Sequence, residues 1–548
     1  MKRKFKTLLS LVLAATCALG TAACSSGNGS NDGRTKFVVF SYAGGYGTAW
    51  LKNAEAEYEK LHEDIDIEVT EEKMQNGSLS SAQIRNSAAK VFFLEQVSYA
   101  NYMAENVMGD ITDVLTSENP YDGKKIIDKF SDQQREYYKV NDAYYGVPHY
   151  SGNNGFIYNK DLFDKNLWYF KKDKPTGDDV LTEDYFVKSA KEERGYGPNG
   201  KTGVIDGVDY SYDDGLPATY KEFILLLDYI ESFNIQNFKP ITVTGGNREQ
   251  YVGLLYNALV TDYEGAEQAM LAYSFDGTAT DLGKIVNGEF VKDAEPTEIN
   301  LNNGYEISRQ AGRYYALEFL NDIFKNKEYY DYTAAVNKSD SNINAQMRFV
   351  RGQAAILMEG VWWESESAKS VFGQLGKTKN DYNFAWMPFP KADESKVGTE
   401  TVADNIYSLC FTKNNLTEEE KKIAKDFIQF LYSDKMLSAF TRDTGTLRSL
   451  NYKVTEEDYN SLTPYGKSVY NHRLVSETVF PFANNAIFRN NQSDFMGRKY
   501  YATNYNNYSY ISAMLLDDYI SKGNISSPKD YFSGMYGYYQ NKWLSYIK

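Results

Sequence analysis

The chain has 548 residues and a formal net charge of −15, with 15% aromatic residues and only three cysteines. Its length favours more than one domain, and its acidic balance argues against nucleic acid or an anionic membrane surface as the main partner. Because Cys17 and Cys24 lie near the N-terminus and Cys410 stands alone, a processed chain would have no internal disulfide. Three widely spaced histidines argue against a dedicated zinc site.

The first 23 residues have the features of a secretory signal. Residues 1–7 are basic, residues 8–19 form an apolar run too short for a membrane span, and small residues precede Cys24. This arrangement is similar to a bacterial lipobox, in which the cysteine sulfur receives a diacylglycerol. We therefore expect a signal peptide over residues 1–23, lipid attachment at Cys24 and a flexible tether over residues 24–35. Plain secretion without lipid is the alternative.

A glycine-rich loop follows the first predicted strand. Residues 36–40 are typical of a buried strand, and residues 41–47 carry Tyr42 and Tyr46 beside three glycines. Glycine backbone allows a ligand to approach closely. The loop lacks the third glycine and the spacing of a dinucleotide-binding fingerprint. Tyr42 and Tyr46 are therefore candidates for ligand contact, and a simple turn is the alternative.

A second buried strand is predicted at residues 91–94, and two polar side chains come directly after it. Glu95 and Gln96 are placed where a strand leaves its sheet, which is where open α/β sheets bind ligands. Both are candidates for contact with a polar ligand. A solvated helix start explains them equally well.

A polar, glycine-rich segment, residues 149–155 (HYSGNNG), lies between the motifs at residues 144–148 (YYGVP) and 157–163 (IYNKDLF). Asparagine can donate and accept hydrogen bonds, which suits a hydroxylated ligand, but asparagines also occur in ordinary turns. The ligand-contact candidates in this segment are His149, Tyr150 and Asn153.

Residues 167–215 are rich in charge, glycine and aspartate. Clustered carboxylates and glycines could hold Ca²⁺, although the spacing matches no EF-hand loop. A solvated insertion is the preferred interpretation. Thr219 and Glu222 then form a predicted capping box at the start of a helix. After a strand at residues 240–243, Asn247 and Arg248 are ligand-contact candidates, or else a helix cap and a surface charge.

The stretch at residues 347–363 (MRFVRGQAAILMEGVWW) combines three features. A helix ends at Gly352, which can adopt the left-handed cap conformation. The apolar run at residues 354–358 is expected to be a strand buried on both faces. Trp362 and Trp363 follow at its exit, and both are candidates for ligand contact. A core position is the alternative for each of them.

Four segments together resemble the extracellular solute-binding proteins of carbohydrate ABC transporters, the relatives of maltose-binding protein. Their order along the chain also agrees with that family, and they span most of the chain after residue 35. The segments are residues 146–163, 217–223 (P-x-T-Y-x-E-F), 349–362 (F-x-x-G-x-A-A-x-x-x-x-G-x-W) and 424–431 (A-x-x-F-I-x-F-L).

The resemblance implies an α/β fold of two hinge-linked lobes with a ligand cleft between them. It places lobe 1 at residues 36–148 plus about 406–480, and lobe 2 at residues 149–405 with an insertion at 167–215. Residues 481–548 would be a helical segment that completes the lobes. The first crossing between lobes would lie at residues 149–155, and Asp404, in the second crossing, is a further ligand-binding candidate.

The function implied is a lipid-anchored protein on the outer face of the cytoplasmic membrane that captures a sugar and delivers it to membrane permease subunits. No cofactor is expected, and Trp362 matches the family's cleft aromatic. Abundant aromatics favour an oligosaccharide, because aromatic planes pack against the apolar face of a pyranose. The chain shows no G-x-S-x-G, Walker or H-E-x-x-H motif. A glycoside-active enzyme and a non-transport receptor or adhesin remain as alternatives.

Overall fold

The computed structural model describes residues 33–73, 77–95, 97, 99–174, 183–404, 408–491, 504–505, 508–509 and 527–548. The expected signal peptide, the lipidation candidate Cys24, most of the tether and the candidate Gln96 lie outside these residues. Within the described ranges, every helix is too short or too polar to span a bilayer.

The first lobe is built on a five-stranded sheet of order β2-β1-β3-β18-β6. The three strands β1 (Thr35–Tyr42), β2 (Ile65–Glu72) and β3 (Val91–Leu94) run parallel. The other two, β18 (Leu409–Thr412) and β6 (Val147–Pro148), complete the sheet, and β18 runs antiparallel to both neighbours. Residues separated by more than 300 positions thus share one core.

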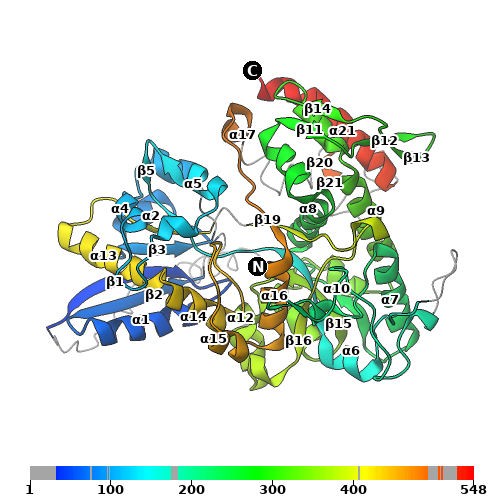
Figure 1. The fold of residues 1–548 in the computed structure, drawn as a ribbon, viewed down its shortest axis with the longest axis horizontal. Coiled ribbons are helices and arrows are strands. Elements are labelled where there is room, and N and C mark those ends of the chain that lie inside the picture. The colour runs from blue at the N-terminus through cyan, green and yellow to red at the C-terminus, as the bar shows by residue number, and fades with distance from the viewer. Residues whose placement is uncertain are drawn as a thin grey trace, which may run out of the picture.

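Helices cover this sheet (Figure 1). Helix α1 (Ala49–Leu61) packs on β2 and against α13 (Glu418–Leu431) and α14 (Asp434–Thr444). A capping box begins α13, since the Thr417 and Glu420 side chains each bond the other residue's backbone N–H. The shorter lobe-1 helices are α2 (Ser81–Asn86), α3 (Tyr99–Ala104), α4 (Thr112–Thr116) and α5 (Asp132–Tyr138).

The second lobe is built on a four-stranded sheet of order β10-β15-β7-β16. Its central strand β15 (Ala354–Gly360) is buried along its whole length, as its apolar run predicts. Strand β10 (Lys239–Thr242) lies parallel to β15, whereas β7 (Asn154–Asn159) is antiparallel to both β15 and β16 (Phe384–Met387). Gly352 ends the preceding helix with a φ of 69°, the conformation expected of it.

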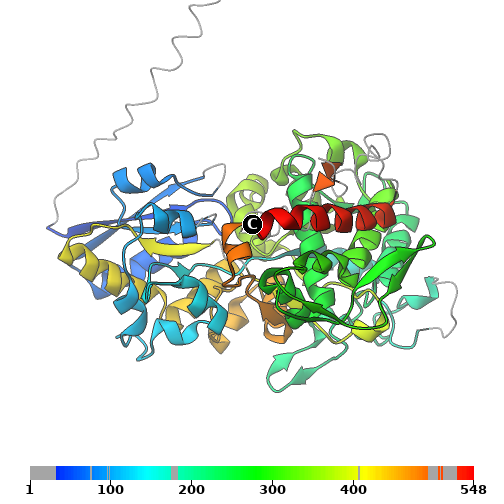
Figure 2. The same cartoon turned by 90° about the horizontal axis from the view of Figure 1, so that it is seen from above.

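Helices pack around this sheet as well. Helix α8 (Arg248–Ser274), which is interrupted by a kink at Gly265, lies against α9 (Ala311–Lys325), and α11 (Asn342–Val350) packs on β15. Figure 2 shows the C-terminal helix α21 (Pro528–Tyr546) lying across this lobe, where it packs on α9. Other helices are α6 (Lys160–Asn166), α7 (Tyr220–Ser232), α10 (Tyr332–Val336), α12 (Trp363–Ser367) and α17 (Ala486–Asn490).

Small two-stranded sheets lie at the periphery of the second lobe. The insertion contains one hairpin, β8 (Val204–Ile205) with β9 (Val208–Asp209). The region after α8 holds β11 (Gly277–Ala279), β12 (Gly283–Val286), β13 (Glu289–Lys292) and β14 (Thr297–Ile299). Strand β17 (Thr401–Ala403) pairs in parallel with β19 (Glu477–Val479) near the junction of the lobes.

The expected limit of lobe 1 near residue 480 needs correction. Helix α15 (Glu456–Ser461) packs on α14, but α16 (Pro464–Val475) packs on β16 of the second lobe. The Trp386 backbone N–H on the edge strand β16 donates to Ser468 Oγ at 2.7 Å. Because none of the described strands pairs with this edge to satisfy its donors, a helix that supplies an acceptor is held there. The chain therefore crosses between lobes a third time, after α14.

Candidate functional site

The loop after β1 faces the segment that connects the two lobes. The Tyr46 hydroxyl donates to Ser151 O at 2.8 Å, and its ring centroid lies 4.2 Å from that of Tyr150. Tyr46 is buried, whereas Tyr42 is half-buried and packs on the Gly44 backbone. A side chain at Gly44 would collide with the Tyr42 ring. The glycines therefore allow two tyrosines to approach the lobe junction together.

Glu95, at the exit of β3, is held beneath this loop. Its carboxylate lies so close to Gly45 that a Cβ atom there would overlap it, and Gly45 has a φ of 50°. The Tyr150 hydroxyl and the Tyr46 backbone N–H both bond the carboxylate. Burial and, to a smaller extent, the Glu366 carboxylate together raise the pKa of Glu95 to about 8, against the opposing effect of the bond from Tyr150.

The second lobe contributes Glu359, which lies inside the otherwise apolar strand β15. Its Oε1 accepts from the Gly360 N–H at 3.0 Å, and its Oε2 accepts from Gln346 Nε2 at 3.2 Å. Tyr251 from α8 also bonds this carboxylate. Burial, followed by the nearby Glu366 carboxylate, raises the pKa of Glu359 to about 8. Glu359 is thus largely protonated at neutral pH.

The two tryptophans after β15 occupy different environments. Trp363 is fully buried and its ring contacts Phe349, Phe384 and Tyr465, with centroid distances of 5.2–5.7 Å. Trp362 is half-buried, its ring lies over Gly360, and it bonds Tyr251. Trp363 is therefore a core residue in this structure, whereas Trp362 keeps an accessible aromatic surface.

Side chains from the two lobes meet at Glu366. Lys73, which follows β2, lies 3.4 Å from Glu366 Oε1, and Gln346 Nε2 donates to Glu366 Oε2 at 3.1 Å. Burial and the carboxylates of Glu95 and Glu366 raise the pKa of the Tyr42 hydroxyl. The first-lobe loop and the end of β15 are thus within electrostatic reach of each other.

The candidates at the start of α8 lie to one side of this group. Arg248 is buried and donates from Nη1 to Gly245 O at 2.8 Å. Its side chain therefore closes the turn that precedes α8. Asn247 is exposed and donates to Asn342 Oδ1 at 3.1 Å, and Asn342 in turn donates to the Tyr251 hydroxyl at 2.7 Å. Asn247 therefore connects to Tyr251 through one intermediate residue.

The remaining candidates lie in the segments that cross between lobes. Asn153 is half-buried, and its carbonyl accepts from the Val361 N–H at 3.0 Å. Asp404 is buried, where its carboxylate accepts from Ser449 Oγ and from Arg473 Nη2 at 3.2 Å. Their backbone and side-chain bonds tie the crossing segments to neighbouring strands and helices.

His149 is buried among aromatic rings of the first lobe, including Trp50 and Phe93. Arg448 Nη1 lies 2.9 Å from His149 Nδ1. Because a guanidinium can only donate, Nδ1 must be the unprotonated nitrogen. Burial and the charge of Arg448 hold the pKa of His149 well below its usual range, which keeps the ring neutral. His149 thus joins the first crossing to residues after α14.

Several residues of this group were not among the sequence-based candidates, namely Lys73, Tyr251, Gln346, Glu359 and Glu366. The only local signal was Glu359, a carboxylate directly after an apolar strand run. The others come from four separate segments, the end of β2 and helices α8, α11 and α12, which only the folded chain brings together.

The aspartate-rich insertion is held by internal hydrogen bonds. Asp213 is fully buried, and its carboxylate accepts from Asn199 N at 3.0 Å and Asn199 Nδ2 at 2.7 Å. Tyr212 donates to Glu400 Oε2 at 2.9 Å, which ties the insertion to the second lobe. Among the residues that the structure describes, no group of three or more His, Cys, Asp or Glu side chains is arranged to hold a metal ion.

Glu359→Gln is expected to make the protein less sensitive to alkaline pH. The folded-state pKa of Glu359, about 8, lies above the value near 4.3 expected in the unfolded chain. Its stabilising contribution is therefore complete below pH about 4 and is lost as pH rises through about 8. Melting temperatures of the wild type and the variant should agree best near pH 4, and the wild type should fall further by pH 9.

The control for this experiment is Glu419→Gln, which changes an exposed glutamate on α13. It should leave the pH dependence of the melting temperature unchanged. Parallel pH profiles for the wild type and Glu359→Gln would contradict a raised pKa at Glu359.

The chain was compared with known proteins. A family model for bacterial extracellular solute-binding proteins matches residues 43–300. No curated protein matches the chain. The structure of RafE in complex with raffinose has a TM-score of 0.52 at 13% identity, and the match covers 92% of this chain and 100% of that one.

Two further solved structures are similar. A chitin oligosaccharide binding protein is 15% identical, with a TM-score of 0.52 and coverage of 93% of this chain and 99% of that one. A cyclic alpha-maltosyl-1,6-maltose binding protein from Arthrobacter globiformis is 12% identical, with a TM-score of 0.51 and coverage of 94% and 100%. At such identities these matches establish the shared two-lobed α/β fold.

Proposed function

We propose that this chain is a bacterial extracellular solute-binding protein that captures a sugar or oligosaccharide between its lobes for delivery to an ABC-type permease. Binding and release, without chemical change of the ligand, would be its activity. The ligand would shift the lobes towards the closed arrangement, to the extent that it binds the closed arrangement more tightly than the open one.

The observation that carries this proposal is the meeting of aromatic and polar groups from both lobes. Trp362 offers an accessible ring next to Glu359 and Tyr251, and Tyr42 lies within electrostatic reach of Glu366. A pyranose has an apolar C–H face that packs on aromatic rings and an edge of hydroxyls that bond carboxyl and amide groups. Tyr46, Tyr150 and Asn153 would support the ligand from the first loop and the first crossing.

The mode of attachment is part of the proposal and rests on the sequence. The basic start, short apolar run and small residues before Cys24 favour lipidation at that cysteine on the outer face of the cytoplasmic membrane. Two membrane-spanning permease subunits would receive the ligand. Labelling of cells with a palmitate analogue should mark the wild type and leave Cys24→Ala unmarked; equal labelling would contradict attachment at Cys24.

The direct test is calorimetry of the purified protein against raffinose, chitin, maltose and xylan oligosaccharides, with chromatography of each mixture afterwards. Saturable binding that raises the melting temperature and leaves the oligosaccharide intact would support the proposal. Breakdown of the ligand would favour a glycoside-active enzyme instead. If none of these oligosaccharides binds, the assignment to carbohydrates is contradicted.

Trp362→Ala should weaken binding of the responsive oligosaccharide by about 1–3 kcal/mol, which is roughly 5- to 150-fold in Kd. The variant removes the accessible ring but leaves the buried Trp363 in place. Calorimetry measures the effect directly. Tyr196→Ala, which removes an exposed aromatic residue of the insertion, is the matched control and should bind like the wild type. An unchanged Kd for a folded Trp362→Ala would remove this residue from the site.

A further inference from the structure

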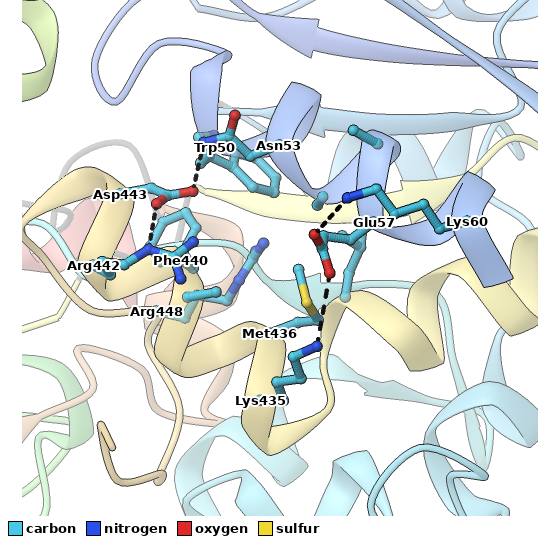
Figure 3. A pocket seen from close by; sticks show the side chains of 14 residues that line it. Trp50, Asn53, Glu57, Lys60, Lys435, Met436, Phe440, Arg442, Asp443 and Arg448 are labelled. Carbon is cyan, nitrogen blue, oxygen red and sulfur yellow. Dashed lines mark hydrogen bonds and ion pairs between the residues drawn. The ribbon is translucent and has the colours of Figure 1, made fainter. Parts of the chain in front are cut away.

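The first lobe has a cavity of about 410 Å³ between α1 and α14, which is within the size range of small-molecule sites. Figure 3 shows that the side chains lining it come from both helices and from Arg448. Trp50, Met436 and Phe440 form apolar walls. None of the residues proposed to contact sugar at the lobe junction lines this cavity.

Polar bridges between the two helices frame the cavity. On one side Asn53 Nδ2 donates to Asp443 Oδ2 at 2.9 Å. On the other, Glu57 lies 3.7 Å from Lys435 and 3.1 Å from Lys60. These pairs, drawn in Figure 3, leave the lining with more positive than negative charge, since Arg442 and Arg448 are added to the two lysines. This is unusual in a chain with a net charge of −15.

Arg448 supplies a charged group that is not fully paired. Its side chain is buried, with only 1% of the residue exposed. Among the described residues, all its side-chain hydrogen bonds come from Nη1, which reaches His149 Nδ1, His149 O and Tyr432 OH at 2.9–3.1 Å. Nε has no acceptor in the described part of the chain. The rings of Trp50, Phe440 and Tyr432 lie 4.4–4.7 Å from the guanidinium carbon, but rings provide no oxygen acceptor.

We propose that this cavity is a second ligand site, which takes a small organic carboxylate with an apolar body. Nε is enclosed, so Nη2, which makes no hydrogen bond to the described residues, is the guanidinium nitrogen that would donate to the carboxylate. The apolar body would lie against Trp50, Met436 and Phe440. A highly charged phosphate fits less well, because the walls are apolar and most other charges are already paired at the rim.

The test uses benzoate as the probe, benzamide as its neutral counterpart, and calorimetry on the whole protein. We expect saturable benzoate binding and at least tenfold weaker binding of benzamide. Ala439→Phe, which places a ring in the cavity from α14, should weaken benzoate binding at least tenfold. Arg448→Lys should do the same, because lysine retains the charge but has no second nitrogen to donate to the carboxylate while the first bonds His149 and Tyr432.

A second blocking variant guards against misfolding. Asn53→Phe covers the cavity from an exposed position on α1, so its effect on the fold should be small, and its melting temperature is measured first. The proposal is overturned if benzoate shows no saturable binding up to about 10 mM, equivalent to less than about 3 kcal/mol of binding free energy. It is also overturned if benzamide binds equally well, or if a folded Asn53→Phe binds benzoate like the wild type.

Discussion

Trp363→Ala is expected to destabilise the protein by about 3–5 kcal/mol, the range measured when a buried tryptophan is truncated. Trp363 is completely buried, and its ring contacts aromatic residues from three elements, α11, β16 and α16. Its removal leaves a cavity where the third crossing of the chain docks on the second lobe. Because that docking depends on side-chain packing, the loss of stability should affect lobe 2 and its junction with α16.

Urea denaturation monitored by fluorescence and circular dichroism measures the effect. The unfolding curve of a two-lobed chain need not be two-state, so the midpoint of each transition is compared rather than one free energy. Trp363→Phe is the matched control, because it keeps an aromatic ring at the same buried position. Trp363→Phe should lower the urea midpoint clearly less than Trp363→Ala does. Equal midpoints for Trp363→Ala and the wild type would contradict the core assignment.

The pair of tryptophans illustrates how far the sequence leads. The apolar run at residues 354–358 predicts a buried strand, and the structure confirms it as β15. From the sequence, ligand contact and a core position were both possible for Trp362 and for Trp363, because either side chain could turn inward after the strand ended. The turn that leads from the end of β15 into α12 places Trp363 inside the core and leaves Trp362 half-exposed.

Long-range placement is what the sequence could not supply. The expected boundary of lobe 1 near residue 480 is wrong because nothing in the sequence of α16 shows that Ser468 will meet the free edge of β16. For the same reason Tyr251 and Gln346 were missed, since each is an ordinary helix residue until it is packed beside Glu359. The family resemblance predicts the two-lobed fold, but the side chains at the junction depend on local loop lengths.

Lys391→Met is expected to cost about 3–5 kcal/mol at neutral pH, because it would leave a buried carboxylate without its partner. Lys391 Nζ lies 2.7 and 2.8 Å from the two oxygens of Asp262, and both residues are buried in the second lobe. Asp262 Oδ1 also accepts from the Thr401 N–H at 3.1 Å. Asp262 on α8 therefore holds both Lys391, in the segment after β16, and the start of β17, three residues before Asp404.

The pKa of Asp262 fixes the pH dependence of this variant. Burial raises that pKa, and the charge of Lys391 opposes the rise. Without the lysine the folded-state pKa should rise further, so the variant gains protons on folding and its stability falls as pH rises. Thermal unfolding should therefore show the penalty shrinking between pH 7 and pH 5. Urea midpoints at neutral pH measure the penalty itself.

The double variant Lys391→Met with Asp262→Asn separates loss of the ion pair from exposure of one unpaired charge. If the penalty arises from the unpaired carboxylate, the neutral amide should recover most of it, since a buried pair is often worth little more than an uncharged replacement. The amide oxygen of the introduced asparagine can still accept from the Thr401 N–H, so the link between α8 and β17 would persist without charge. A double variant as unstable as Lys391→Met would instead mean that the lysine stem fills space that methionine cannot fill.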